Sequence, residues 1–160
     1  MIRKLDINDA AYMLEWMHDS NVIKYLNNKF LTKTLDDCIK FIESTEKLTV
    51  DVHFAIANDD GEYQGTVSLK DINYQKNFAE FAIVVRTVAM GKGYAKEGMN
   101  YILNYGKNVL KLSKIYWCVE IDNNRAVSFY DKNGYKRTNI VPKEILENYT
   151  NKRRLYWYHY

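Results

Sequence analysis

An apolar strand that runs into a glycine-rich turn and then directly into a helix is the most constraining feature of this sequence. Residues 81–85 are all apolar, and the turn reads Gly91-Lys92-Gly93. Glycine lets the backbone approach a ligand closely, and the first turn of a helix presents N–H groups that have no partner within the helix. Together with the positive end of the helix dipole, these donors make a site for a phosphate-sized anion. The sequence therefore predicts a phosphate-bearing ligand at this turn.

Two common phosphate-binding motifs do not match the turn. A P-loop has a glycine five residues before its Gly-Lys pair and a Ser or Thr after it, but Arg86 and Gly93 stand at these positions. A dinucleotide fingerprint has a third glycine where this sequence has Lys96, and an acidic residue about 20 residues further on, where residues 109–115 contain none. The turn therefore belongs to another class of phosphate site, and a tight turn that binds no ligand stays the alternative.

Length and composition restrict the class of protein. The chain has 160 residues, which suits a single domain over residues 1–160. It has no apolar run of about 20 residues that would span a membrane, and its first residues lack the apolar core of a signal peptide. Cys38 and Cys118 are far apart, which argues against a zinc site and suits a reducing cytoplasm. We therefore expect a cytoplasmic protein without a metal or a membrane partner, and a net charge of +3 is too small to indicate nucleic acid.

The pattern of apolar residues predicts an α/β domain with a mixed, mostly antiparallel central sheet of about seven strands, flanked by about four helices. Asn8 and Thr34 are predicted N-caps, and Gly134 is predicted to end the last helix. The helix at 91–110 is expected to bury one face, which includes Val109. Strands are expected at 2–5, 52–57, 64–71, 78–86, 115–120, 135–140 and 155–160, and helices at 8–19, 35–48, 91–110 and 124–133, with a short helical turn at 21–26.

Three motifs, taken in this order, resemble the GNAT superfamily of acetyl-CoA-dependent N-acetyltransferases. The first is the Gly-Lys-Gly turn after an apolar strand. The second is an Asn, an Ala and a Tyr at Asn123, Ala126 and Tyr130, and the third is Gly134-Tyr135 at the end of the same predicted helix. The resemblance covers essentially the whole chain, and within the superfamily the chain resembles the branch that includes ribosomal-protein alanine acetyltransferases and spermidine acetyltransferases. One departure is Val88, where the superfamily often has Gln or Arg.

This resemblance implies an enzyme that moves an acetyl group from acetyl-CoA to a primary amine by direct attack. The acceptor stays open among an amino sugar, a polyamine and a protein or peptide N-terminus. A GNAT-like coenzyme A-binding module without turnover stays the alternative. The resemblance also places the pantetheine arm along Ile83, Val84 and Val85 and beside Asn123 and Tyr130, and the pyrophosphate at Met90, Gly91, Lys92, Gly93, Tyr94, Ala95 and Lys96.

The same resemblance implies that Tyr130 is the general acid towards the departing sulfur of coenzyme A and that Glu80 is the base, acting directly or through a water. The alternatives are a tyrosine that only packs on the sheet and a glutamate that faces solvent. His53 is a second candidate base, because a histidine has a pKa suited to neutral pH. Either Arg86 or Lys92 is expected to add positive charge near the phosphates.

The acceptor is expected between the first helices and the last strands, around residues 16–34 and after residue 135. Acidic residues in this region have two interpretations, attraction of a cationic acceptor or capping of helices. The chain is expected to be a monomer or a homodimer, and a nucleic-acid binder that uses Arg153 and Arg154 is disfavoured by the small net charge. The acidic residues are Asp19, Asp36 and Asp37, the aromatic residues that would stack on a ring are Trp16, Tyr25 and Phe30, and Asn27, Asn28 and Lys29 would suit a polar acceptor.

Overall fold

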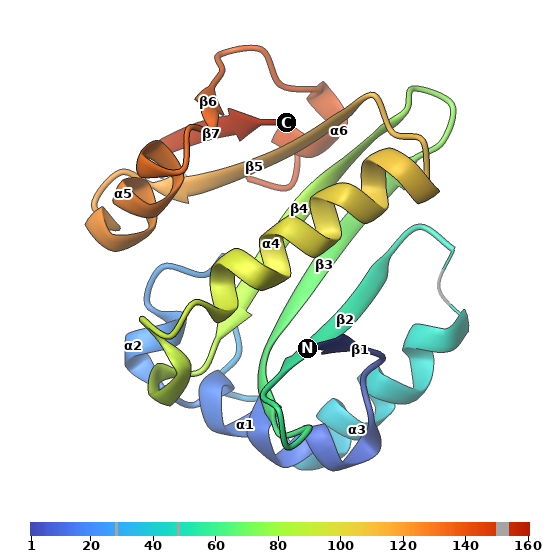
Figure 1. Cartoon of the computed structure of the whole chain (residues 1–160), viewed down its shortest axis with the longest axis vertical. Helices are drawn as coiled ribbons and strands as arrows, with labels where there is room; N and C mark the ends of the chain where they lie inside the picture. Colours follow the sequence, from blue (N-terminus) through green and yellow to red (C-terminus); the bar gives the residue numbers. More distant parts are fainter. Residues whose placement is uncertain (28, 48, 150–153) are drawn as a thin grey trace.

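The computed structural model describes residues 1–27, 29–47, 49–149 and 154–160. This part of the chain forms a seven-stranded sheet that helices flank (Figure 1). The strand order is β1-β2-β3-β4-β5-β7-β6, so β7 is inserted between β5 and β6. The strands are β1 (Ile2–Arg3), β2 (Val52–Ala57), β3 (Tyr63–Asn73), β4 (Phe78–Val85), β5 (Lys114–Glu120), β6 (Lys136–Arg137) and β7 (Leu155–His159). The α-helices are α1 (Ala10–Met17), α2 (Ser20–Ile23), α3 (Leu35–Ser44), α4 (Tyr94–Asn104), α5 (Asn124–Lys132) and α6 (Lys143–Leu146).

The pairing of β4 with β5 is the parallel contact in an otherwise antiparallel sheet, and α4 provides the crossover that this pairing requires. The two strands pair only over residues 78–80 and 114–116. Beyond Glu80 they diverge, and the sheet opens between them (Figure 1). We call this opening the fork, bounded by residues 81–85 of β4 and 117–120 of β5. The mixed, mostly antiparallel sheet expected from the sequence is confirmed.

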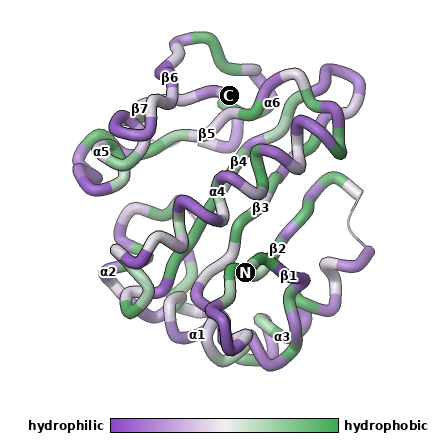
Figure 2. The backbone as a smooth tube through the Cα atoms, viewed as in Figure 1, coloured by the Kyte–Doolittle hydropathy of each residue, from purple (hydrophilic) through white to green (hydrophobic). Residues whose placement is uncertain are grey.

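The sheet separates two hydrophobic cores. On the face that we call the front, α4 and α5 cover a core that includes Phe81, Met99 and Trp117. On the back face, α1 and α3 cover a second core that includes Trp16 and Cys38. Hydrophobic stretches accordingly follow the central strands, whereas the outer turns of the helices are polar (Figure 2). Within the described residues, no helix has the length and apolar character needed to cross a membrane.

The predicted start of the first helix at Asn8 is wrong. Asp6 is the cap, because its carboxylate accepts the N–H of Asn8 and opens a 3-10 turn at Ile7–Asp9 before α1 begins. The predicted cap Thr34 is confirmed, since its hydroxyl accepts the N–H of Asp37 and the Asp37 carboxylate accepts the N–H of Thr34. The helix that it begins ends earlier than expected, at Ser44, and Leu48 lies outside the described residues.

The predicted helix at 91–110 is shorter in the structure. It begins at Tyr94, because Gly91 and Gly93 have φ values of 78° and 88°, which no α-helix accommodates. It ends at Asn104 and continues as a π-helical turn at Tyr105–Val109. The wider turn changes the helical register, so Val109 is exposed and not buried as predicted.

Near the end of the chain the predicted strand at 135–140 is reduced to Lys136–Arg137. The short helix α6 was not predicted, although Pro142 directly before it is a typical helix-start signal. With α2, it brings the described helices above the expected number. The predicted end of α5 is confirmed, because Gly134 has a φ of 78° directly after it.

Candidate active site

The turn between β4 and α4 has the geometry of an anion site. Gly93 is the N-cap of α4, and no side chain in the described part of the chain caps this helix start. The first N–H groups of α4 are therefore left without side-chain acceptors. The helix dipole adds partial positive charge at the same place. Residues 90–96, which the sequence predicted to bind the pyrophosphate, lie together here, with Lys92 and Lys96 exposed.

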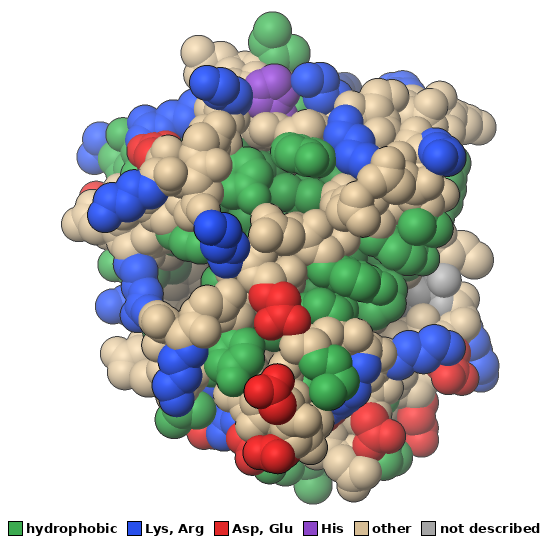
Figure 3. All heavy atoms as spheres, in the orientation of Figure 1, with side chains coloured by type: hydrophobic (Ala, Val, Ile, Leu, Met, Phe, Trp, Pro, Cys, Tyr) green, Lys and Arg blue, Asp and Glu red, His purple; other side chains and the backbone are tan. Residues whose placement is uncertain are grey.

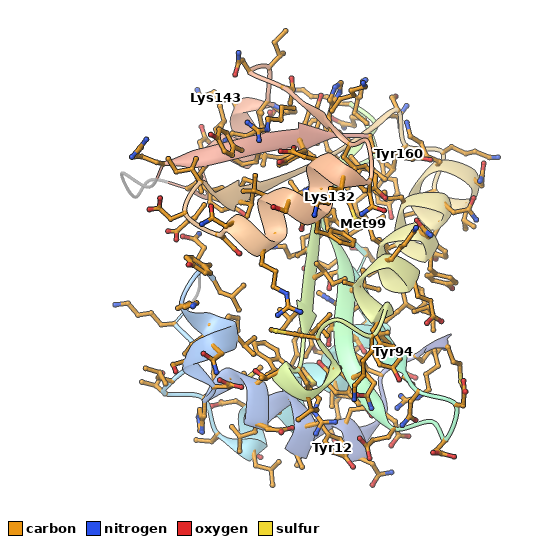
Figure 4. All side chains as sticks on the ribbon, turned by 60° about the vertical axis from the view of Figure 1, so that its left-hand side comes forward. Tyr12, Tyr94, Met99, Lys132, Lys143 and Tyr160 are labelled. Carbon is orange, nitrogen blue, oxygen red and sulfur yellow. The ribbon has the colours of Figure 1, made fainter. Side chains whose placement is uncertain are left out.

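Arg86 does not supply charge to this turn, and that part of the expectation is wrong. Its guanidinium is buried on the back side of the sheet, where Nε lies 2.7 Å from Glu15 and Nη1 lies 3.0 Å from Glu62. It also donates to the carbonyl of Tyr63 and stacks 4.4 Å from the ring centroid of Tyr12 (labelled in Figure 4). Through these contacts, Arg86 links α1 to β3 and to the end of β4.

Arg125, which the sequence did not single out, lies against the turn instead. Its Nη1 atom is 3.3 Å from the sulfur of Met90, and its Nη2 atom is 3.8 Å from where a Cβ on Gly91 would stand. Arg125 belongs to the first turn of α5, on the other wall of the fork. No local pattern reveals that this helix start faces the glycine turn, because the contact spans 35 residues and depends on the crossover between β4 and β5.

The open edge of β4 provides backbone groups along the fork. Ile83, Val84 and Val85 are half-buried, and none of them pairs with a described residue of β5. Because side chains alternate along a strand, Ile83 and Val85 pack on the front core and Val84 on the back core. The backbone groups that point away from β3 remain available to an extended ligand lying in the fork.

Glu80 stands at the point where the fork begins. Its side chain is only 2% exposed, so the alternative of a solvent-facing residue is wrong. It lies opposite Lys70 on β3, and its carboxylate accepts a hydrogen bond from the hydroxyl of Tyr149. Burial raises the pKa of Glu80, while Lys70 and then the Tyr149 hydroxyl act in the opposite direction. The result is a buried carboxyl with a raised pKa, the kind of group that acts as a base in active sites.

Tyr130 lies on α5, on the other wall of the fork. It is 7% exposed, and its ring centroid lies 5.5 Å from that of Trp117 and 5.1 Å from that of Tyr158. Its hydroxyl makes no hydrogen bond to another residue in the described ranges. Burial raises the pKa of Tyr130, so the hydroxyl keeps its proton. The side chain of Asn123 accepts the N–H of Ala126 and caps α5.

His53 is less well placed than Glu80 to act as a base. It lies on β2, two strands away from β4, where Phe41 of α3 packs on it. Its Nδ1 atom is 2.7 Å from the hydroxyl of Ser68. Burial lowers the pKa of His53, an effect that Asp51 partly offsets.

Most residues that were candidates for acceptor binding have structural roles. Trp16 is buried, donates to Tyr63 and packs on Phe30, so it does not form an exposed stacking surface. Asp19 caps α2, and Asp37 belongs to the cap of α3. Across the fork, Tyr25 donates to the carbonyl of Asp122, and Asn27 donates to the carbonyl of Asn148. Asn28 and Arg153 lie outside the described residues.

Comparison with known proteins identifies the family. A family model described as an acetyltransferase (GNAT) domain matches residues 1–136. The chain belongs to the GNAT acetyltransferase family. A spermidine N(1)-acetyltransferase from Vibrio cholerae is 26% identical to it over 97% of this chain and 90% of the relative. One from Escherichia coli K12 is 27% identical over 92% of this chain and 78% of the relative.

The GNAT fold is confirmed by solved structures. The crystal structure of spermidine N-acetyltransferase from Vibrio cholerae in complex with CoA and spermine superposes with a TM-score of 0.83. It covers 100% of this chain and 94% of its own, at 21% identity. As a GNAT enzyme, the chain is an acetyl-CoA-dependent N-acetyltransferase. The uncapped start of α4, the glycine turn and the free edge of β4 fit that cofactor, which carries a pyrophosphate and an extended arm.

Proposed function

We propose that this GNAT enzyme acetylates a primary amine of a polyamine such as spermidine. The names of the relatives support this acceptor, and so does the distribution of charge. Residues 1–85, from β1 to the end of β4, contain 14 of the 20 acidic residues but only 9 of the 23 basic ones. In the view of Figure 3, acidic side chains gather mostly in the lower half, and basic ones are more frequent above. A polycationic acceptor would be attracted to the acidic part of the molecule, and a polyanionic cofactor to the basic part.

The observation that carries the proposal is the buried carboxyl of Glu80 at the start of the fork. A charged ammonium cannot attack a thioester until it loses a proton, so a base must stand next to the acceptor. Among the charged neighbours of Glu80, Lys70 has the largest effect, and the carboxylates of Asp71 and Asp51 act against it. The expectation of a monomer or homodimer stays a prediction.

The residues in and around the fork have different roles in the proposed reaction. Acetyl-CoA supplies the thioester and the thiol leaving group. We assign its pyrophosphate to residues 90–96 and its arm to the edge of Ile83–Val85 and to Asn123. Glu80 takes the proton of the incoming ammonium, directly or through a water. The acceptor nitrogen loses two protons on the way from ammonium to amide, of which Glu80 takes the first. Tyr130 donates its hydroxyl proton to the developing thiolate and regains a proton when the nitrogen loses its second one, so one proton is released to solvent through Glu80 for each acetyl group transferred.

Arg125 is expected to bind the pyrophosphate from the opposite wall of the fork. Arg125→Gln should weaken binding of acetyl-CoA about tenfold, since it removes a charge-assisted hydrogen bond at an exposed site. Binding of S-acetylpantetheine, which has no phosphate, should not change. Isothermal titration calorimetry measures both affinities. Lys132→Gln is the matched control, because Lys132 lies on the same helix and its loss removes the same charge (Figure 4). Equal losses with both ligands would contradict this role.

An amine panel tests the proposed acceptor. Release of free coenzyme A thiol is measured with acetyl-CoA and spermidine, spermine, an amino sugar or a peptide with a free N-terminus. We expect kcat/KM for spermidine to exceed that for the amino sugar and the peptide at least about tenfold, which corresponds to about 1.4 kcal/mol of transition-state stabilisation. A higher kcat/KM for the amino sugar or the peptide would contradict the proposed polyamine acceptor and identify that compound class as the acceptor. If acetyl-CoA binds but no amine in the panel causes release of coenzyme A thiol, the result would favour a coenzyme A-binding module without turnover.

A further inference from the structure

The segment that follows α6 places a tyrosine against the proposed base. The hydroxyl of Tyr149 donates a hydrogen bond to the Glu80 carboxylate, across 69 residues of sequence. The Tyr149 ring stands perpendicular to Trp157 of β7, at 5.2 Å between ring centroids. The neighbouring Asn148 donates to the carboxylate of Asp71 at 3.0 Å. The tyrosine is therefore held in place from both β7 and the end of β3.

Several charged or titratable groups face Glu80 from the elements packed around it. Lys70 and Asp71 lie on β3, and Asp51 lies directly before β2. Cys118 of β5 lies beside the Tyr149 hydroxyl. Asp71 and Asp51 disfavour the ionised carboxylate, and so does burial, whereas Lys70 and the Tyr149 hydroxyl favour it. Burial, then Cys118 and Glu80, raise the pKa of Tyr149, so this hydroxyl stays protonated and remains a donor.

We propose that Tyr149 is a positioning residue for acetyl transfer, whose hydroxyl holds the Glu80 carboxylate ionised and directed to the start of the fork. The proposal rests on the assignment of Glu80 as the base. A carboxylate has four lone-pair sites, so it accepts the Tyr149 hydrogen bond and still takes a proton from the acceptor or from a water. Without the tyrosine, burial and two neighbouring carboxylates would raise the pKa of Glu80 further against the opposing effect of Lys70.

The pH profile of Tyr149→Phe tests this role. Loss of a hydrogen bond to a charged carboxylate raises the pKa of Glu80, so the acidic limb of kcat/KM should move to higher pH by about one unit. At alkaline pH, where Glu80 is ionised in both proteins, the loss of kcat/KM should be smaller than at acidic pH, and what remains of it reports on the direction of the carboxylate. Tyr74→Phe is the matched control, because it also removes a hydroxyl that donates a hydrogen bond, to the carbonyl of Thr49, and it should leave the limb in place.

A double-mutant cycle with Glu80→Gln separates positioning from structural support. If Tyr149 acts through Glu80, the substitution Tyr149→Phe should have no further effect on kcat/KM in the Glu80→Gln background. An equal loss at every pH, additive with Glu80→Gln, would overturn the proposal and leave Tyr149 as packing. A profile that Glu80→Gln itself leaves unchanged would instead reject Glu80 as the base. Thermal melts of both single variants identify any loss that comes from unfolding.

Discussion

Replacement of Tyr130 by Phe is expected to lower kcat about a hundredfold or more and to leave the affinity for acetyl-CoA unchanged within about twofold. Phe keeps the ring contacts with Trp117 and Tyr158 and removes only the hydroxyl. Because that hydroxyl has no hydrogen-bond partner in the described ranges, its loss should not destabilise the fold. A selective loss of turnover would therefore report on the chemical step and not on packing.

The pKa of Tyr130 restricts how the proton moves. An ordinary thiol has a pKa of ~8.5 and a tyrosine ~10, so complete proton transfer to a thiolate is uphill by ~2 kcal/mol. Burial raises the pKa of Tyr130 and makes early transfer still less favourable. The hydroxyl should thus act first as a hydrogen-bond donor to the developing thiolate, with proton transfer late. The same shift implies that Tyr130 stays protonated over the whole working range and adds no alkaline limb to the pH profile.

The measurement is steady-state release of coenzyme A together with a separate binding titration of acetyl-CoA. Tyr101→Phe serves as the control, because Tyr101 lies on the outer side of α4 and packs on Phe54 away from the fork. Its kcat should match that of the unsubstituted enzyme. A kcat within a few-fold of wild type in Tyr130→Phe would remove Tyr130 from the chemistry and restore its interpretation as a packing residue.

Local patterns predicted the glycine turn and the start of α4 better than the long-range contacts around them. Three features of the site depend on local backbone conformation and on residues close in sequence: the glycine turn, the helix after it and the Asn123 cap. Local residue patterns are therefore sufficient to predict them. Arg86 and Arg125 show the limit of such reasoning. Arg86 is close to the turn in sequence, but its ion pairs with Glu15 and Glu62 hold it on the back side of the sheet. Arg125 is 35 residues from Met90 in the chain and contacts the turn instead.

The fork itself has no local signature. The sequence predicts strands at β4 and β5, but not that their pairing ends at Glu80 after three residues. The sequence does not predict that Glu80 is buried either, because a single glutamate in an apolar strand is compatible with either face of a sheet. Glu80 is paired with Lys70 of β3 and Tyr116 of β5, and its carboxylate accepts a hydrogen bond from Tyr149, 69 residues away in the chain. Long-range pairing and packing thus decide the site's electrostatics.

Replacement of Glu80 by Gln is expected to lower kcat/KM for the amine acceptor about a hundredfold and to abolish the acidic limb of the pH profile. Gln has nearly the same shape, and its amide oxygen still accepts the Tyr149 hydroxyl, but it cannot take a proton. In the wild type, the base is active only when ionised. Since burial raises the pKa of Glu80, kcat/KM should begin to fall, as pH decreases, at a pH above the ordinary pKa of a glutamate.

The effect on stability has the opposite sign, which makes the experiment decisive. A carboxyl whose pKa is raised by folding stabilises the folded state when protonated and loses that contribution as pH rises through its folded pKa. At pH 7 the ionised Glu80 therefore costs stability, and Glu80→Gln should show an unchanged or raised Tm together with its loss of activity. Glu43→Gln, an exposed substitution on α3, should change neither quantity. A low Tm in Glu80→Gln would attribute the loss to unfolding, whereas a normal Tm with an intact acidic limb would require a different base.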